Sequence, residues 1–263
     1  MKRSEFFSAA RSGVFAGKLS QPQVDGLDAI LDEAEKRGTP IQHLAYILAS
    51  AHHETGGRFQ PIEEYMFYSA KRLTQVWPKR FPTIAAAQPY ANNSKGLANK
   101  VYGGRMGNAL NEGWTYRGRG LIQITGKDNY AKFGIATVPD KALQMPTSVM
   151  ILFNGMERGL FTGKKLSDYL NDKKTDYTAA RAIVNGDTKT NGAKIAATAK
   201  AFEKALRLSG YNGTPFLDHV PVTPEPGPAS KARGIAALIA AALLAAGAWL
   251  ASIPCNLFGV FCQ

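Results

Sequence analysis

A change in composition near residue 213 divides this chain into parts of different chemistry. Residues 214–233 hold five prolines, which favour extended backbone and remove amide donors, so we interpret this stretch as a linker. Residues 234–253 carry no charge, and a helix needs about 20 such residues to span a bilayer. The sequence therefore predicts a folded domain over residues 1–213, a proline-rich linker, a C-terminal hydrophobic, transmembrane helix and a short tail over residues 254–263.

The flanks of the uncharged segment predict its orientation. Lys231 and Arg233 precede it and no charge follows it, so the body is expected in the cytoplasm, with Cys255 and Cys262 outside, where they could stay oxidised. A buried alanine-rich helix packed on the body is the alternative for this segment. Because charges beginning at Glu5 interrupt the first apolar stretch, we expect no cleaved signal peptide.

The positive charge of the chain belongs entirely to the predicted domain. The chain holds 32 Lys and Arg against 20 Asp and Glu, a net charge of +12, and the residues beyond Gly213 are neutral. Such an excess favours an anionic partner: nucleic acid, anionic lipid or an acidic wall polymer. The basic residues are dispersed, with short pairs such as Lys71-Arg72 and no basic stripe along a helix, so we expect no nucleic acid.

Helical periodicity dominates the domain. Ser20-Gln21-Pro22-Gln23 is typical of a capping box, and the apolar pattern that follows predicts a helix ending at Gly38. Thr39-Pro40 predicts the start of a second helix, which Gly56-Gly57 ends. Beyond these, the sequence predicts helices over 177–184 and 193–208, long ordered loops over about 88–128, and a short strand over 121–124. The expected fold is mainly α, with a loop-lined cleft.

Glu54 occupies an unusual position in the second of these helices. The spacing of Leu44, Ile47, Ala51 and Glu54 is 3, 4 and 3, which places Glu54 on the apolar stripe at the C-terminal end. Burial and the negative end of the helix dipole both disfavour a charged carboxylate there, which suits a general acid. The alternative is a glutamate at a frayed helix end that points to solvent.

His53 precedes this glutamate, which raises the question of a metal. The zinc spacing His-Glu-x-x-His is absent, because Gly57 stands where the second histidine would be. We therefore expect no metal. His53 either helps hold the cleft or is an ordinary, partly buried histidine.

Two further segments offer polar groups for sugar chemistry. Glu63 and Glu64 follow the turn after the helix, and a chain that reverses there could face one of them toward Glu54, the two-carboxylate arrangement of glycoside hydrolysis. The alternative is an exposed acidic pair. Farther along, Gln123 and Thr125 would present an amide and a hydroxyl from the predicted strand, groups that suit sugar hydroxyls or a positioned water.

Four motifs in this order resemble glycoside hydrolase family 19, the family of plant-type chitinases and many phage endolysins. The resemblance covers about residues 1–210 and implies a lysozyme-like, mainly α, bilobal domain with a substrate cleft, an inverting mechanism and no cofactor. The motifs are Ala51-His-His-Glu-Thr-Gly-Gly57, Tyr102-Gly-Gly-Arg-Met-Gly-Asn108, Tyr116-Arg-Gly-Arg-Gly-Leu-Ile-Gln-Ile-Thr-Gly126 and Arg181-Ala-Ile-Val-Asn-Gly186.

The resemblance also implies roles for single residues. Glu54 matches the family's general acid and Glu64 its general base, with Glu63 as the rival. Thr125 would help hold the attacking water. The expected substrate-binding residues are Glu63, His53, Tyr116, Gln123, Asn129 and Asn185, and Arg119 is a further cleft candidate. Inversion needs room for a water, so the two carboxyl groups should lie about 6.5–9.5 Å apart.

The departures from the plant enzymes favour one substrate. Their paired disulfides are absent, and the stretch between Glu54 and Tyr116 is short, as in phage members whose usual target is peptidoglycan. We therefore expect a monomeric endolysin-type glycosidase that cleaves β-1,4 bonds between amino sugars, anchored in the membrane or held in the host cytoplasm until lysis. The alternatives are a chitinase and, from another class, a non-catalytic membrane-anchored wall-binding protein.

Overall fold

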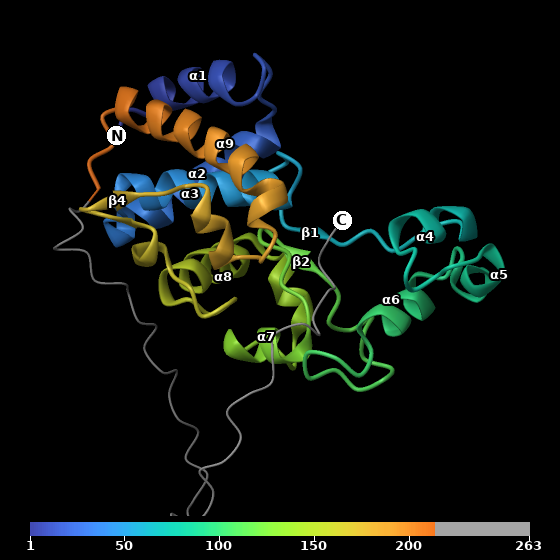
Figure 1. Ribbon diagram of the computed structural model, residues 1–263. Helices are drawn as coiled ribbons and strands as arrows, with labels where there is room; N and C mark the ends of the chain where they lie inside the picture. Colours follow the sequence, from blue (N-terminus) through green and yellow to red (C-terminus); the bar gives the residue numbers. More distant parts are fainter. Residues whose placement is uncertain (214–263) are drawn as a thin grey trace, which may run out of the picture. The chain divides into compact units, whose positions relative to one another are not determined.

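The computed structural model describes residues 1–213 of the chain (Figure 1). The predicted linker over 214–233, the predicted transmembrane helix over 234–253 and the tail over 254–263 with its cysteines lie outside the described residues. Among the helices of residues 1–213, none combines the length and the apolar character needed to cross a bilayer.

The described residues are mainly helical, as the sequence predicts. The α-helices are α1 (Arg3–Gly13), α2 (Gln21–Arg37), α3 (Ile41–Glu54), α4 (Ala70–Val76), α5 (Ile84–Ala87), α6 (Ser94–Tyr102), α7 (Lys127–Lys132), α8 (Met145–Arg158) and α9 (Thr188–Leu208). Short 3-10 helices are η1 (Gln88–Tyr90), η2 (Pro139–Leu143), η3 (Leu166–Asp168) and η4 (Ala179–Ile183). Two short antiparallel ladders pair β1 (Ile62–Glu63) with β2 (Arg119–Gly120) and β3 (Leu170–Asn171) with β4 (Lys174–Thr175).

Two separate hydrophobic cores hold these elements. The larger collects buried side chains of α1, α2, α3, α8 and α9, and the smaller those of α4, α5 and α6. Figure 1 shows α4, α5 and α6 gathered apart from the other helices. We call residues 65–111 the small lobe and the rest of residues 1–213 the large lobe. Two cores are what a bilobal domain requires.

The β1–β2 ladder lies where the chain enters and leaves the small lobe. Ile62 pairs with Gly120 and Glu63 with Arg119, so the segment that leads into the small lobe pairs with a segment that follows the lobe by eight residues. The side-chain amide of Gln123 adds to this ladder, because its Nε2 donates to the carbonyls of Ile62 at 2.8 Å and Gly120 at 2.9 Å. The residues that follow the two strands enter different cores: Met66 lies in the smaller one and Leu121 in the larger one.

The two helices predicted from capping signals are confirmed, but only α2 has the predicted cap, because α3 begins at Ile41 after Pro40 without a side-chain cap hydrogen bond. At the start of α2 the side-chain oxygen of Gln23 accepts the backbone N–H of Ser20 at 2.8 Å, as a capping box requires. Helix α3 ends at Glu54, and the hydroxyl of Thr55 donates to the Ala51 carbonyl at 2.7 Å. Glu54 is thus the last residue of the helix, as its spacing predicts.

The predicted strand over 121–124 is wrong. Residues 121–123 form a turn instead, with Gly120 at φ +90° and Gln123 at φ +55°, and Arg119 bridges Ile124 across it. The alternation of apolar and polar residues was misleading, because Leu121, Ile122 and Ile124 are all buried in the larger core. A turn buries them together without the period of a strand.

Other elements also differ from the prediction. The stretch predicted as loops over 88–128 contains α6, whose N-cap Asn93 accepts the Gly96 N–H at 2.9 Å. The helix predicted over 177–184 is the 3-10 helix η4, and the one predicted from Ala193 begins five residues earlier, at Thr188. Helix α6 is hard to predict because its N-cap is an asparagine in a stretch rich in Gly and Asn, and asparagine is common both in loops and at helix N-caps.

Candidate active site

Glu54 lies at the end of α3 with its carboxylate held by a buried arginine. Leu44, Ile47 and Ala51, which precede Glu54 on the apolar stripe, are fully buried, whereas the Glu54 side chain is 18% exposed. Arg181 of η4 donates from Nη1 to Glu54 Oε1 at 2.7 Å. A guanidinium at this distance stabilises negative charge on the carboxylate. The helical pattern predicted the position of Glu54 but not this partner.

Arg181 is shared between Glu54 and Asp187. Its Nε donates to Asp187 Oδ1 at 2.5 Å and its Nη2 to Oδ2 at 3.3 Å, while Asn191 donates to Oδ2 at 2.6 Å. Burial by itself would raise the pKa of Asp187, but the hydrogen bonds from Arg181 and Asn191 lower it below its ordinary value. Asp187 therefore stays ionised and pairs with Arg181 together with Glu54.

Glu64 is the first residue after β1 and is held from both sides. Its backbone N–H donates to the Gly118 carbonyl at 2.9 Å, which continues the ladder. The Tyr102 hydroxyl, at the end of α6, donates to Oε1 at 2.6 Å, and the Gly118 N–H donates to Oε2 at 3.2 Å. Burial raises the pKa of Glu64 above its ordinary value, and these two hydrogen bonds offset part of that rise.

Glu63 faces a different partner, because successive side chains of an extended segment point to opposite faces. Its side chain is 42% exposed and pairs with Arg117 Nη2 at 2.7 Å. The Arg117 guanidinium in turn lies 3.7 Å from the centre of the Trp114 ring. Glu63 is thus tied to a stacked arginine, whereas Glu64 receives only uncharged donors.

Gly118 sits directly against Glu64 and Gln123. A Cβ at this position would lie 3.1 Å from Glu64 Cβ and 3.1 Å from Gln123 Oε1, which is closer than side chains normally approach. The Gln123 amide oxygen and the Glu64 carboxylate therefore flank one glycine. The structure brings these two predicted residues together, and the Gln123 amide nitrogen is used to hold the ladder.

Thr125 and Asn129 form a short chain of hydrogen bonds beyond Gln123. The Thr125 hydroxyl donates to the Gln123 carbonyl at 3.2 Å, and Asn129 Nδ2 donates to the Thr125 carbonyl at 2.7 Å. Asn129 Oδ1 accepts a hydrogen bond from Lys132 at 2.9 Å. The amide of Asn129 is engaged at both ends, so it supports the backbone that carries Thr125.

Asn185 and His53 accompany the Glu54–Arg181 pair. The Asn185 N–H donates to the Arg181 carbonyl at 3.0 Å, which places Asn185 beside the buried arginine. Burial lowers the pKa of His53, the neighbouring positive charge of Arg181 also lowers it, and Glu54 opposes the change. His53 is therefore neutral at pH 7.

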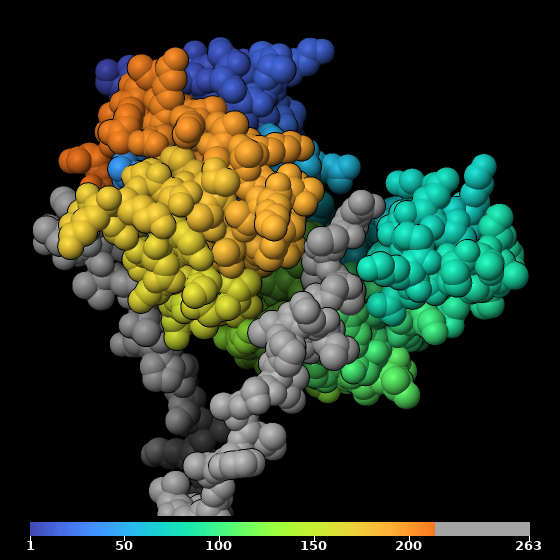
Figure 2. Space-filling model, viewed as in Figure 1, coloured from blue at the N-terminus to red at the C-terminus, as the bar shows by residue number. Residues whose placement is uncertain are grey.

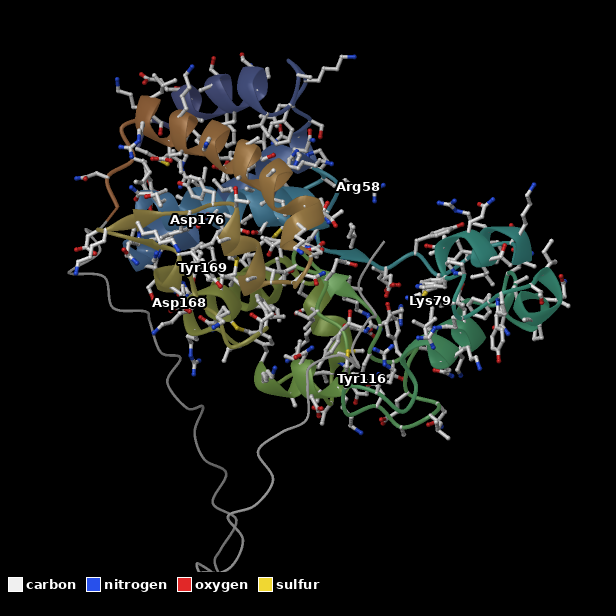
Figure 3. All side chains as sticks on the ribbon, in the orientation of Figure 1. Arg58, Lys79, Tyr116, Asp168, Tyr169 and Asp176 are labelled. Atoms are coloured by element: carbon white, nitrogen blue, oxygen red, sulfur yellow. The ribbon has the colours of Figure 1, made fainter. Side chains whose placement is uncertain are left out.

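Tyr116 and Arg119 belong to the interior. Both side chains are buried, and the Tyr116 hydroxyl donates to the Ala136 carbonyl at 3.0 Å. Figure 3 shows Tyr116 near α7, within the large lobe. Arg119 donates to the Thr115 carbonyl and to the Tyr130 hydroxyl and pairs with Asp140. In this arrangement both residues brace the segment that carries Gly118 rather than face an open surface.

The two sides of the candidate site come from the two lobes. In Figure 2 the segment of η4 and α9, drawn yellow to orange, and the blue-green small lobe form separate parts of the surface. Arg181 comes from the first side and Tyr102 from the second. Within residues 1–213, no group of three His, Cys, Asp or Glu side chains is placed to hold a metal ion.

The functional partners that the sequence reasoning missed are Arg181, Asp187 and Tyr102. Arg181 and Tyr102 belong to motifs given above, but their spacing along the chain does not predict which side chains they contact. Arg181 lies 127 positions from Glu54, and Tyr102 lies 38 from Glu64. The one available signal was that cationic Arg181 lies in an otherwise apolar stretch.

Comparison with known proteins gives one curated relative in sequence and several weak likenesses in structure. No protein-family model matches the chain. The solved structures include chitinase C from Streptomyces griseus HUT6037, at 16% identity and a TM-score of 0.38 over 81% of this chain and 78% of that one. Another is a bacterial family 19 chitinase, at 17% identity and a TM-score of 0.37 over 81% and 97% of the two chains. TM-scores this low do not establish a common fold.

The sequence relative is a "Glycosyl hydrolase family 19 domain-containing protein" of Haemophilus influenzae. It is 42% identical over 127 residues, which cover 46% of this chain and 63% of the relative. The chain therefore matches less than two thirds of the length of that protein. Over the aligned residues, the resemblance of this chain to glycosyl hydrolase family 19 is confirmed.

Proposed function

We propose that this chain is an endolysin-type glycosidase that hydrolyses β-1,4 bonds between amino sugars of peptidoglycan with inversion. The observation that carries the proposal is a pair of carboxylates in two contrasting settings. Glu54 is held by a buried arginine of the large lobe, whereas Glu64 is held by a tyrosine hydroxyl of the small lobe and a backbone N–H. Such a contrast suits an acid and a base working on one bond in a lysozyme-like, bilobal domain.

Glu54 would act as the general acid. Arg181 donates two hydrogen bonds to Asp187 and one to Glu54, so the second oxygen of Glu54 is free of this arginine and could carry the proton for the leaving group. When Glu54 protonates the leaving oxygen, the glycosidic C–O bond breaks and Glu54 becomes an anion. Arg181 stabilises that anion as it forms, which favours the transition state over the bound substrate.

Glu64 would act as the general base. It would take a proton from a water molecule whose oxygen attacks the anomeric carbon on the face opposite the leaving group, which inverts the configuration. Glu63 suits this role less, because Arg117 neutralises its charge. The Gln123 amide oxygen beside Gly118 and the hydroxyl of Thr125 are candidates to hold the water and the sugar.

The substrate assignment rests on the short stretch between Glu54 and Tyr116, on the absence of cysteines from residues 1–213 and on the positive charge of these residues. A basic surface attracts an anionic wall polymer over long range and raises the encounter rate. Chitin is the alternative, with the same chemistry on an uncharged glycan. The proposal includes anchoring in the membrane through residues 234–253. The alternative location is the host cytoplasm until lysis.

The proposal is tested on three substrates with the intact chain. We expect it to clear a suspension of permeabilised bacteria and to release reducing sugars from purified peptidoglycan faster than from chitin. Product analysis by NMR in the first minutes should show the α-anomer, because the bond cleaved is β. Hydrolysis of chitin alone would support the chitinase alternative. Tight wall binding without any new reducing ends would support the non-catalytic binder and contradict the proposal.

The hydrogen bond from Tyr102 to Glu64 predicts a change in pH dependence. A general base must be ionised, so activity falls as the pH drops through the pKa of Glu64. The Tyr102 hydroxyl favours the ionised form and lowers that pKa. Tyr102→Phe removes this effect, so the acidic limb of kcat/KM should move to higher pH while the basic limb stays in place.

Tyr68→Phe is the matched control for this experiment. Burial raises the pKa of Tyr68, and the nearby negative charge of Glu64 raises it further, yet Tyr68 donates no hydrogen bond to that carboxylate. Its loss should leave the acidic limb where it is. An equal shift in both variants, or none in Tyr102→Phe, would remove Glu64 from the role of base.

A further inference from the structure

The small lobe carries a concentrated positive charge without any carboxylate of its own. Within residues 65–111 the sequence has seven basic residues and not one Asp or Glu. This lobe therefore supplies more than half of the net charge of +12 of the whole chain. The seven are Lys71, Arg72, Lys79, Arg80, Lys95, Lys100 and Arg105, and Figure 3 labels Lys79 on this lobe.

These cations have no anionic partner in the described domain. No ion pair of residues 1–213 includes any of the seven. In the large lobe some cations are paired, since Arg3, Arg37 and Arg181 each contact two or more carboxylates, whereas others such as Lys18 form no ion pair within the described domain. What sets the small lobe apart is that it has no carboxylate at all. The charge of the small lobe is thus left for a group outside the described domain to neutralise.

Three of the cations gather at the C-terminal end of α6. Arg80 donates from Nη1 to the Lys100 carbonyl at 3.1 Å, and Arg105 donates from Nη1 to the Val101 carbonyl at 3.3 Å. Partial burial lowers the pKa of Arg80, and the like charge of Arg105 lowers it further. Two guanidiniums that repel each other without a counterion form a setting that an anion with several oxygens, such as a phosphate, would stabilise.

Exposed apolar side chains occur in the same lobe. Six large apolar residues of the described domain stand out as exposed, and four of them are Tyr65, Phe67, Ile84 and Leu110. Leu110 lies over Gly104, since its Cδ2 is 3.3 Å from where a Cβ of that glycine would be. This places an apolar side chain, 81% exposed, next to the residue that precedes Arg105. The lobe therefore carries both unpaired cations and exposed apolar groups, and at Leu110 the two kinds of side chain are close in space.

We propose that the small lobe is a surface that binds anionic lipid bilayers. Phosphate groups of the lipid would neutralise its cations, while Tyr65, Phe67, Ile84 and Leu110 would enter the interface between headgroups and acyl chains. An acidic glycan could use the cations but would gain nothing from an exposed isoleucine and leucine. The proposal goes beyond glycan hydrolysis and does not depend on it.

The test compares two triple variants of the full chain that lose equal charge. One is Lys71→Gln/Lys79→Gln/Lys95→Gln in the small lobe, and the control is Lys18→Gln/Lys200→Gln/Lys204→Gln in the large lobe. All six lysines are exposed and form no ion pair in the described domain. Binding is measured by co-sedimentation with vesicles of phosphatidylcholine alone and of phosphatidylcholine with one third phosphatidylglycerol. Any contribution of residues 214–263 is the same in every variant.

We expect the wild-type chain to bind the anionic vesicles more tightly than the neutral ones. The small-lobe triple should lose about tenfold or more of this excess at low salt, because each lysine near an anionic surface contributes substantially to binding, and the control triple about twofold or less. Equal losses in the two triples, or no anionic excess in the wild type, would overturn the proposal. A small-lobe triple that still binds vesicles but no longer binds purified peptidoglycan would assign the surface to the substrate instead.

Discussion

Glu54→Gln should lower kcat on peptidoglycan by about a hundredfold to ten-thousandfold, the range that positioned general acids contribute. Glutamine keeps an oxygen that can accept the hydrogen bond from Arg181, so the buried guanidinium is not left without its partner. The variant therefore should fold and bind glycan as the wild type does. What it loses is the proton for the leaving oxygen. Reducing-sugar release and the binding isotherm on purified peptidoglycan measure the two effects separately.

The dependence on the leaving group makes this test specific to an acid. An aryl glycoside with a nitrophenol leaving group needs little protonation, so Glu54→Gln should be far less impaired on it than on peptidoglycan. Glu5→Gln is the control for charge: Glu5 forms an exposed pair with Lys2, and such a pair contributes little to stability. Equal impairment of Glu54→Gln on both substrates would mean that Glu54 is not the proton donor.

The sequence predicts those parts of the fold that depend on residues close together along the chain. Helix α2 follows from a capping box within four residues, and the end of α3 follows from a stripe within one helix. The turn over 121–123 could not be predicted in this way, because its apolar residues are buried by the larger core and the Leu121 N–H is satisfied by the Ser148 hydroxyl, 27 positions away. Tertiary contacts decide such segments, and periodicity does not record them.

The same distinction applies to the site. Short motifs in the sequence were enough to select Glu54, Glu64 and Gln123 as candidate site residues. The contacts that give the two glutamates different settings come from elsewhere: Arg181 reaches Glu54 from η4, and Tyr102 reaches Glu64 from α6. Motifs therefore identify the reacting groups, and the fold supplies the groups that tune them. The carboxyl separation of about 6.5–9.5 Å for inversion stays a prediction.

Glu64→Gln and Glu63→Gln together should identify the base. Glu64→Gln is expected to lower kcat by about a hundredfold or more, because the attacking water keeps its proton. Glutamine keeps the size of the side chain and can still accept the hydrogen bond from Tyr102, but its amide nitrogen cannot accept the weaker one from the Gly118 N–H. Glu63→Gln removes the counterion of Arg117 and should cost about tenfold or less in kcat/KM, because its carboxylate takes no proton in the proposed reaction.

Azide distinguishes a lost base from a lost fold. Azide attacks the anomeric carbon without giving up a proton, so it needs no base and should restore cleavage in Glu64→Gln, with an α-glycosyl azide as the product. It should not restore Glu54→Gln on peptidoglycan, where the leaving oxygen still lacks its proton. The Glu63→Gln rate should be the same with and without azide. If azide instead rescues Glu63→Gln and leaves Glu64→Gln inactive, then Glu63 is the base, and the hydrogen bonds from Tyr102 and Gly118 hold a structural carboxylate.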